Sequence, residues 1–286
     1  MTKKLKAELL LVLATFVWGI GYPLTSLALK DCGPYTFMTI RSIIAALILG
    51  ILFYKKFKLI NKNTLKIALI ISFYMFTGIA LQVIGMVYTT PSKSAFITGL
   101  YSVFVPIILA IFYKKLPNKR TIIGVTLSVA GLFSMSINGL NGTSGLNIGD
   151  LLTILCAVAF SMQIILVDKY ADEVDPILIT ILELAIVGIL GLFPAISVEE
   201  FRIALNIRSI VVLLCTSIFS TSLGMVIMNK MQPETDPTHA SIIYLGEPVF
   251  SAIFSVFIGD ILSGGTMLGC IFILLGMVVT SVKLSK

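Results

Sequence analysis

The sequence predicts an all-α membrane protein with ten transmembrane helices in two inverted repeats of five helices. The 286 residues are 57% hydrophobic and 12% charged, with a mean hydropathy of +1.04, whereas soluble domains carry about 25% charged residues. Apolar runs of about 20 residues, enough to cross a bilayer core of roughly 30 Å, recur along the whole chain. Weak similarity between two halves with five crossings each predicts that the second half enters the membrane from the opposite side.

The five expected spans of the first half are continuous apolar runs, which favour helices over the alternating strands of a barrel. The first run follows Lys3, Lys4 and Lys6 and lacks a small-residue cleavage site, so we expect a retained helix rather than a signal peptide. The fourth run contains Pro106, where we expect a kink. The expected spans are 7–29, 35–53, 66–89, 94–113 and 120–137.

The second half repeats this organisation after a Gly- and Asn-rich stretch. The domains are therefore expected at 1–137 and 150–286, joined by an extracytoplasmic linker at 138–149. The expected spans of the second half are 150–167, 177–196, 209–230, 238–258 and 265–282.

Related positions in the two halves support the repeat. An offset of 142 residues aligns Trp18 with Phe160 and Arg41 with Glu183, and an offset of 145 aligns Leu100 with Leu245. These matches are sparse, but they occur in the same order in both halves. An inverted repeat of this kind is typical of transporters that alternate between inward-open and outward-open states.

The distribution of positive charge predicts the orientation. With ten crossings, the loops and ends on the side of the termini hold sixteen Lys and Arg residues, against four on the other side. Both termini are therefore expected in the cytoplasm, and the protein is expected in the cell membrane. The net charge of +7 follows from this topology. The sequence has no basic segment interleaved with exposed aromatic residues, so nucleic-acid binding is not expected.

Glu247 and Pro248 stand side by side inside an apolar run of the ninth span. A carboxylate at the centre of a membrane helix costs about 2.5–3.5 kcal/mol on insertion scales, so it should face protein or water. Pro248 removes a backbone donor and is expected to kink the helix. The pair predicts a bent, polar region near the middle of the membrane.

Polar and aromatic side chains at helical spacing predict a central cavity, although packing between helices is the alternative for each of them. The candidates for lining the cavity or binding substrate are Trp18, Tyr22, Gln82, Thr98, Tyr101, Gln163, Tyr244 and Glu247. The candidates for coupling or gating are Glu247, Arg41, Glu183 and His239, with local anchoring of Arg41 and Glu183 and capping by His239 as the alternatives. The four cysteines show no metal-type spacing, so no metal and no cofactor are expected.

Three stretches resemble the drug/metabolite transporter superfamily, EamA type. Their most specific parts are Trp18 with Gly19, the segment 237–240, and Glu247 with Pro248, within "ATFVWGIGYPLTSLALKDCGPYTFMTIR" and "DPTHASIIYLGEPVFSAIFSVFIGD". The resemblance implies ten helices in two inverted repeats around a central cavity lined by helices 1, 3, 4, 6, 8 and 9. Members of this family export amino acids and drugs or import nutrients.

The sequence therefore predicts a secondary transporter that moves a small organic metabolite such as an amino acid, or a drug-like solute, across the cytoplasmic membrane by alternating access. The alternative is a membrane enzyme that uses Mg²⁺ to act on a lipid phosphate through the acidic loop 168–175. The absence of a P-loop argues against ATP hydrolysis, and the transporter reading predicts that the protein is not an enzyme. Proton coupling or facilitated diffusion, import or export, and monomer or homodimer are left open.

Overall fold

The computed structural model describes residues 2–89, 91–137, 147–203, 206–257 and 263–281, and describes residues 91–93, 135–137, 255, 257 and 281 as backbone only. In these parts of the chain, helices are joined by short loops and turns, and an isolated β-bridge links Cys32 to Ile203. Most of the predicted linker, residues 138–146, lies outside the described residues.

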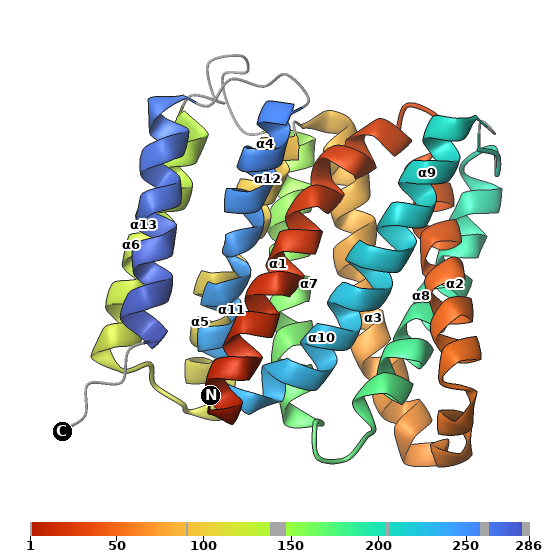
Figure 1. The fold of residues 1–286 in the computed structure, drawn as a ribbon, viewed down its shortest axis with the longest axis horizontal. Coiled ribbons are helices and arrows are strands. Elements are labelled where there is room, and N and C mark those ends of the chain that lie inside the picture. The colour runs from red at the N-terminus through yellow and green to blue at the C-terminus, as the bar shows by residue number, and fades with distance from the viewer. Residues whose placement is uncertain (1, 90, 138–146, 204–205, 258–262, 282–286) are drawn as a thin grey trace.

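Thirteen α-helices and one π-helical segment make up the bundle of described residues (Figure 1). The elements up to residue 137 are α1 (Lys3–Ala28), α2 (Pro34–Leu52), α3 (Lys62–Tyr88), α4 (Pro91–Thr98), α5 (Tyr101–Tyr113) and α6 (Lys119–Ile137). Those from residue 148 onward are α7 (Ile148–Lys169), α8 (Pro176–Ser197), α9 (Ile207–Cys215), the π-helix η3 (Thr216–Leu223), α10 (Gly224–Met231), α11 (Pro237–Tyr244), α12 (Gly246–Phe257) and α13 (Gly264–Ser281). Two short 3₁₀ segments are η1 (Tyr54–Leu59) and η4 (Gln232–Glu234).

The helices have the length and composition of membrane spans. Seven helical stretches of the described chain are long and apolar enough to cross a bilayer, and a shorter apolar helix covers Gly264–Thr280. In each of the seven, 50–61% of the most apolar window is buried inside the protein. Large apolar side chains such as Phe112, Phe193 and Ile207 are 75–83% exposed, as expected of a surface that contacts lipid. The prediction of an all-helical integral membrane protein is confirmed, whereas the ten crossings and their inverted arrangement stay predictions.

Capping residues set several helix starts a few residues before the apolar runs begin. The side chains of Asn61, Asn206, Asp175 and Asp236 accept hydrogen bonds from the first-turn amides of α3, α9, α8 and α11. The side chain of Asn147 forms a reciprocal capping box at the start of α7. Because these groups satisfy backbone donors that have no partner within the helix, each helix extends to its cap.

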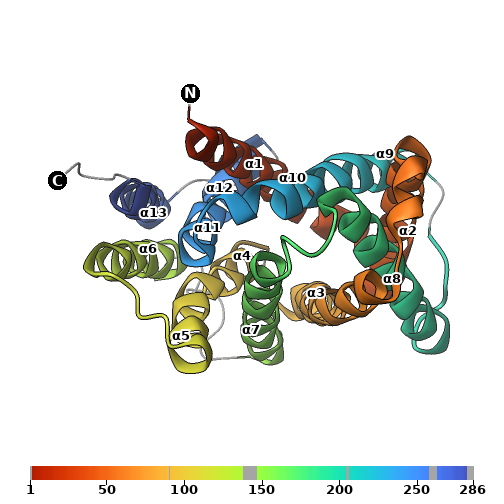
Figure 2. The same ribbon diagram turned by 90° about the horizontal axis from the view of Figure 1, so that it is seen from below.

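The principal contacts between helices join the part of the chain before residue 137 to the part after residue 147. The most extensive pairs are α6 with α13, α3 with α7, α2 with α8 and α1 with α12. Figure 2 shows α6 and α13 together at one edge of the bundle, and α2 and α8 at the other.

Glycines allow the closest of these approaches. A Cβ added to Gly131 would lie 2.6 Å from the carbonyl oxygen of Gly269, and one added to Gly276 would lie 2.7 Å from that of Gly124. Since real Cβ atoms keep at least about 3 Å from other heavy atoms, the backbones of α6 and α13 meet only because these positions lack side chains.

Two of the predicted helices are interrupted, and the interruptions lie before the prolines expected to kink them. The span 94–113 is divided between α4 and α5 at Gly99 and Leu100, while Pro106 lies buried inside α5. The span 238–258 is divided between α11 and α12 at Leu245, and Pro248 lies in the first turn of α12. The two breaks are adjacent, because a Cβ on Gly99 would lie 3.0 Å from Leu245 Cδ2.

Polar groups fasten the helix ends at the end of the bundle where α1 finishes. Arg208 donates from Nε and Nη2 to the carboxylate of Asp31 over 3.1 and 2.5 Å, and Ser209 Oγ donates to the same carboxylate over 2.8 Å. These hydrogen bonds lower the pKa of Asp31. Glu199, which follows α8, accepts from the backbone amides of Tyr35 and Thr36 over 3.0 Å each and so caps α2.

Candidate functional site

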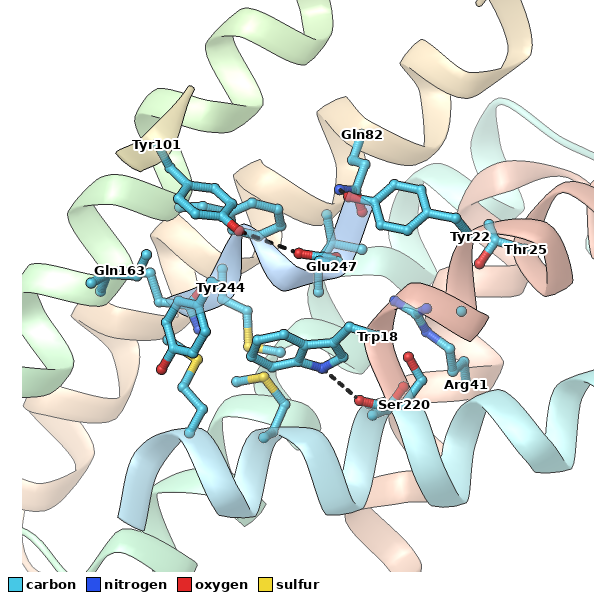
Figure 3. Close-up of a pocket in the computed structure, with 18 of the residues that line it drawn as sticks. Trp18, Tyr22, Thr25, Arg41, Gln82, Tyr101, Gln163, Ser220, Tyr244 and Glu247 are labelled. Carbon is cyan, nitrogen blue, oxygen red and sulfur yellow. Dashed lines mark hydrogen bonds between the residues drawn. The ribbon is translucent and has the colours of Figure 1, made fainter. Parts of the chain in front are cut away.

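A cavity lies between the helices in the middle of the bundle and is lined by both parts of the chain (Figure 3). Its walls come from α1, α2, α3, α5, α7, η3, α10, α11 and α12. The space open to the centre of a water-sized sphere is about 120 Å³, several times the roughly 10–15 Å³ that one water requires. A small organic molecule fits a space of this size better than a bare ion does.

Trp18 forms one wall of the cavity. Its indole Nε1 donates a 2.9 Å hydrogen bond to the carbonyl of Ser220, which lies in the π-helix η3 (Figure 3). A carbonyl oxygen has two lone pairs, so the Ser220 carbonyl can accept from the indole as well as from the helix backbone. The ring also lies against Gly224, where an added Cβ would be 2.4 Å from Nε1. The wall therefore depends on both the π-helix and the glycine.

Glu247 enters the cavity from the first turn of α12, directly after the break at Leu245. Tyr101 OH donates to Glu247 Oε2 over 3.4 Å, and Tyr101 is itself the first residue after the other break. The two interrupted helices thus bring a carboxylate and a phenol together at the same point. Interrupted membrane helices are typical of binding sites, because they free backbone groups and reorient side chains at the depth where a solute is held.

Gln82 joins α3 to α1 and α4. Its Nε2 donates to Tyr22 OH over 3.0 Å and lies 3.4 Å from Thr98 Oγ1. Gln82 and Tyr22 line the cavity, whereas Thr98 is buried behind them and holds the Gln82 amide in place.

Tyr244 lines the cavity through α11 and is fixed from the other side. Its OH donates to Gln232 Oε1 over 3.0 Å, and Gln232 Nε2 donates to the carbonyl of Ile164 over 2.7 Å. Gln163, next to Ile164, faces the cavity, and its Nε2 has no hydrogen-bond partner among the described residues. The cavity therefore offers a free amide donor beside a rigidly held tyrosine.

Arg41 reaches the cavity from α2, where the sequence predicts gating or anchoring. Its guanidinium carbon lies 5.3 Å from the centre of the Phe37 ring. Its Nε is buried without a hydrogen-bond partner, and no carboxylate of the described residues forms an ion pair with it. Of the residues that line the cavity, Arg41 and Glu247 are the charged ones.

Glu183, at the position that the repeat aligns with Arg41, lies away from the cavity lining. It is fully buried, and Asn229 Nδ2 donates to its Oε2 over 2.6 Å and to Thr180 Oγ1 over 2.9 Å. This contact joins α8 to α10. It fits the anchoring alternative, and a role in coupling or gating stays a prediction.

His239 lies in the first turn of α11, outside the cavity lining. Its Nε2 is 3.1 Å from Glu8 Oε1, and the ammonium of Lys4 is 3.4 Å from the same oxygen. The backbone amide of His239 donates to the capping carboxylate of Asp236. These contacts connect α11 to the beginning of α1.

The acidic loop after α7 does not gather its carboxylates for a metal ion. Asp175 caps α8 and forms an ion pair with Lys56, and Glu173 accepts a 3.1 Å hydrogen bond from Asn63 Nδ2. Within the described residues, no group of three His, Cys, Asp or Glu side chains is placed to hold a metal. The magnesium-dependent alternative gains no support from this geometry.

Other lining residues carry little signal in the sequence. Phe160 lines the cavity and occupies the position that the repeat aligns with Trp18, so the alignment of the two halves could have identified it. Ser220 and Thr221 owe their place in the lining to the π-helix, which composition does not reveal. The apolar part of the wall includes four methionines, which are Met75, Met86, Met225 and Met228.

Comparisons with known proteins agree on one family. The model of the EamA-like transporter family matches residues 5–137 and again residues 147–282. An "Uncharacterized transporter" of Archaeoglobus fulgidus is 32% identical over 98% of this chain and 87% of its own length. The "Uncharacterized transporter YvbV" of Bacillus subtilis is 26% identical over 98% of this chain and 93% of its own. A protein of known crystal structure shares the fold, with a TM-score of 0.81, 14% identity and coverage of 97% of each chain.

Proposed function

This chain belongs to the EamA-like transporter family, and we propose that it is a secondary transporter moving a small organic solute across the cytoplasmic membrane by alternating access. The observation that carries this proposal is the central cavity, to which both parts of the chain contribute polar, aromatic and charged side chains. A site lined by both parts can open to either side when they move relative to each other.

The proposal includes two inverted repeats, 1–137 and 150–286, and matched contacts in the two parts support them. Trp18 packs against Gly224, and its counterpart Phe160 packs against Gly78, where an added Cβ would lie 2.5 Å from the ring. In the α6 and α13 pair, Gly131 approaches Gly269 as Gly276 approaches Gly124. Gly131 and Gly276 are 145 positions apart, and so are Gly124 and Gly269, so the repeat converts one of these two contacts into the other, as expected of a two-fold relation.

The polar contacts at the two ends of the bundle also correspond. Asp31 with Arg208 at one end matches Glu173 with Asn63 at the other, at offsets of 142 and 145 residues. One end therefore has an ion pair where the other has a neutral donor. Because the contacts at the two ends differ in strength, the inward-open and outward-open states differ in free energy even though the two repeats have the same fold.

The π-helix η3 agrees with the same correspondence. Asn206 lies before η3 and Gly224 directly after it, and their counterparts in the first part of the chain are Asn61 and Gly78. Asn61 and Asn206 are 145 positions apart, whereas Gly78 and Gly224 are 146 apart. One extra residue between these points is what a π-helical turn contains. The carbonyl that accepts from Trp18 belongs to Ser220 in this π-helix.

Proton exchange through Glu247 is the proposed source of energy. The carboxylate faces a cavity that is large enough for water, and an ionisable group inside a membrane protein is a natural carrier of a proton between two states.

The asymmetry of Lys and Arg over the loops supports cytoplasmic termini.

Reconstituted protein tests the proposal. Purified protein in proteoliposomes should show saturable counterflow of at least one small solute from a panel of amino acids, nucleobases, vitamins and cationic drugs, and the same solute should raise its melting temperature. The absence of counterflow for every solute by folded protein would refute transport.

The coupling mechanism needs a separate comparison. A pH gradient should drive uptake by the wild type and by Glu200→Gln, since the side chain of Glu200 is 74% exposed and pairs with Arg202. It should not drive uptake by Glu247→Gln, which should still carry out counterflow at solute concentrations that saturate its site. Gradient-driven uptake by Glu247→Gln would exclude Glu247 as the proton carrier.

A further inference from the structure

We infer that the solute is a zwitterion whose anionic group binds at Arg41 and whose cationic group binds at Glu247; the inference rests on the proposed transport function. These two residues are the charged members of the cavity lining, and they carry opposite charges. Figure 3 shows Glu247 between Tyr101 and Tyr22, and Arg41 below Tyr22 beside Ser220. No ion pair joins Arg41 to Glu247 in the described part of the chain, and the contacts of Glu247 there are with the hydroxyls of Tyr101 and Tyr22, so both charges are left to be compensated by a ligand.

The Arg41 end is suited to a carboxylate. A guanidinium presents five N–H donors in a fixed plane and stays charged, and it matches the two oxygens of a carboxylate. Here Nε is buried without a partner, and the neighbouring aromatic ring of Phe37 supplies no acceptor oxygen. A buried cation without a counter-ion is unfavourable, and a bound anionic group relieves that cost.

The Glu247 end is suited to an ammonium group. The carboxylate receives a long hydrogen bond of 3.4 Å from Tyr101 and contacts the hydroxyl of Tyr22, and its two oxygens keep acceptor capacity for a ligand. Tyr101, which donates to Glu247, belongs to a row of aromatic rings: it packs edge to face on Tyr244 at 6.5 Å between ring centres, and Tyr244 packs on Trp18 at 5.3 Å. A carboxylate together with aromatic faces attracts a cation more strongly than either does alone.

The pair of charges selects against solutes with a single charge. A zwitterion compensates both Arg41 and Glu247, whereas a simple cation or anion leaves one of them buried and unpaired. The methionines of the wall, among them Met75 and Met225, are flexible and apolar, so they adapt to side chains of different shape. The cavity therefore discriminates by charge and tolerates variation in the apolar part of the solute.

Ligands with one charge blocked test this inference. Leucine, methionine and phenylalanine are each compared with their amides, which keep the ammonium, and with their N-acetyl derivatives, which keep the carboxylate. Binding is measured from melting temperatures, and transport by counterflow in proteoliposomes. At least one of the three zwitterions should bind on the order of tenfold more tightly than both of its blocked derivatives.

Two substitutions assign the ends. Arg41→Gln should weaken binding of the zwitterion on the order of tenfold and leave binding of the amide unchanged. Glu247→Gln should weaken the zwitterion similarly and leave the N-acetyl derivative unchanged. Matched controls are Arg202→Gln and Glu200→Gln, whose side chains are 81% and 74% exposed. If Arg41→Gln fails to fold, Arg41→Lys serves instead, because it keeps the charge and loses the planar donor geometry.

The outcomes separate this inference from the transport function. Equal binding of the zwitterions and their blocked derivatives, or substitutions that weaken all three forms alike, would overturn the zwitterion assignment. Saturable counterflow of a neutral or singly charged solute, with no response to any zwitterion, would do the same and leave transport standing. If folded protein carried no solute at all, both proposals would fall.

Discussion

Substitution of Gly224 by alanine should damage the wall of the cavity without touching its charged residues. A Cβ at this position would lie 2.4 Å from Nε1 of Trp18 and 3.0 Å from Cε2 of the same ring. Ordinary van der Waals contact begins at 3.4 Å, so the indole has to move by about 1 Å. Nε1 would then leave the carbonyl of Ser220, to which it now donates over 2.9 Å.

The expected destabilisation follows from three contributions. Overpacking costs about 1–3 kcal/mol, and loss of a hydrogen bond costs about 0.5–1.5 kcal/mol. Alanine is the better helix former by about 1 kcal/mol. The net loss is therefore roughly 0.5–3.5 kcal/mol, with weaker solute binding because Trp18 lines the cavity.

The assay is the melting temperature of purified protein in detergent, together with its shift on adding a transported solute. Gly264→Ala is the matched control, because nothing lies within 4 Å of the added Cβ there. In the Trp18→Phe background, Gly224→Ala should cost less, since the smaller ring leaves room for the methyl group. The reasoning is refuted if Gly224→Ala matches Gly264→Ala in both melting temperature and solute affinity.

Three further substitutions test contacts outside the cavity wall. Asp31→Asn should lower the melting temperature at pH 7, because Arg208 lowers the pKa of Asp31; the difference from wild type should be full above the unfolded pKa of about 3.9 and vanish as pH falls through the lower folded value. Asn229→Leu removes the 2.6 Å donor to buried Glu183 and should cost about 1.5–3 kcal/mol by thermal denaturation. Glu199→Ala removes the acceptor of two amides in the first turn of α2; it should cost about 1 kcal/mol and speed hydrogen exchange of those amides.

Each of these expectations has a result that contradicts it. A difference between Asp31→Asn and wild type that does not shrink as pH falls below about 3.9 would show that the ion pair is not the cause. Full stability of Asn229→Leu would mean that Glu183 needs no donor. Unchanged exchange in the first turn of α2 would show that Glu199 does not cap that helix in solution.

The sequence predicts the helical spans well because each depends on a long apolar run, a property of the local chain. Of the eight side chains that the sequence proposes for the cavity, all but Thr98 lie in the lining, among them Trp18, Gln82 and Glu247, while their part in binding a solute stays a prediction. Which face of a helix points inward is set by tertiary packing. Thr98 is three residues before Tyr101, a spacing that predicts the same helix face, but it lies behind Gln82 rather than in the lining.

The interruptions of the helices are the features that local rules describe least well. Proline frees the carbonyl four residues earlier, which for Pro248 is that of Tyr244, directly before the break at Leu245. For Pro106 it is that of Ser102, whereas the break lies earlier, at Gly99 and Leu100, next to Leu245. Arg41 is a similar case: snorkelling is a sound expectation for an arginine in a membrane helix, but the guanidinium is directed into the cavity. Both outcomes depend on a neighbour that is far away in the sequence.

The pairing of early helices with late ones has a consequence for biosynthesis. The partner of each of α1, α2, α3 and α6 in its most extensive contact is translated only after residue 147. When the ribosome has delivered the first 137 residues, these helices can make only their less extensive contacts with one another, and surfaces such as that around Gly131 have no partner yet. A chain that ended there would lack the most extensive helix contacts of the folded protein, and quality-control proteases would meet it as an incompletely packed fragment.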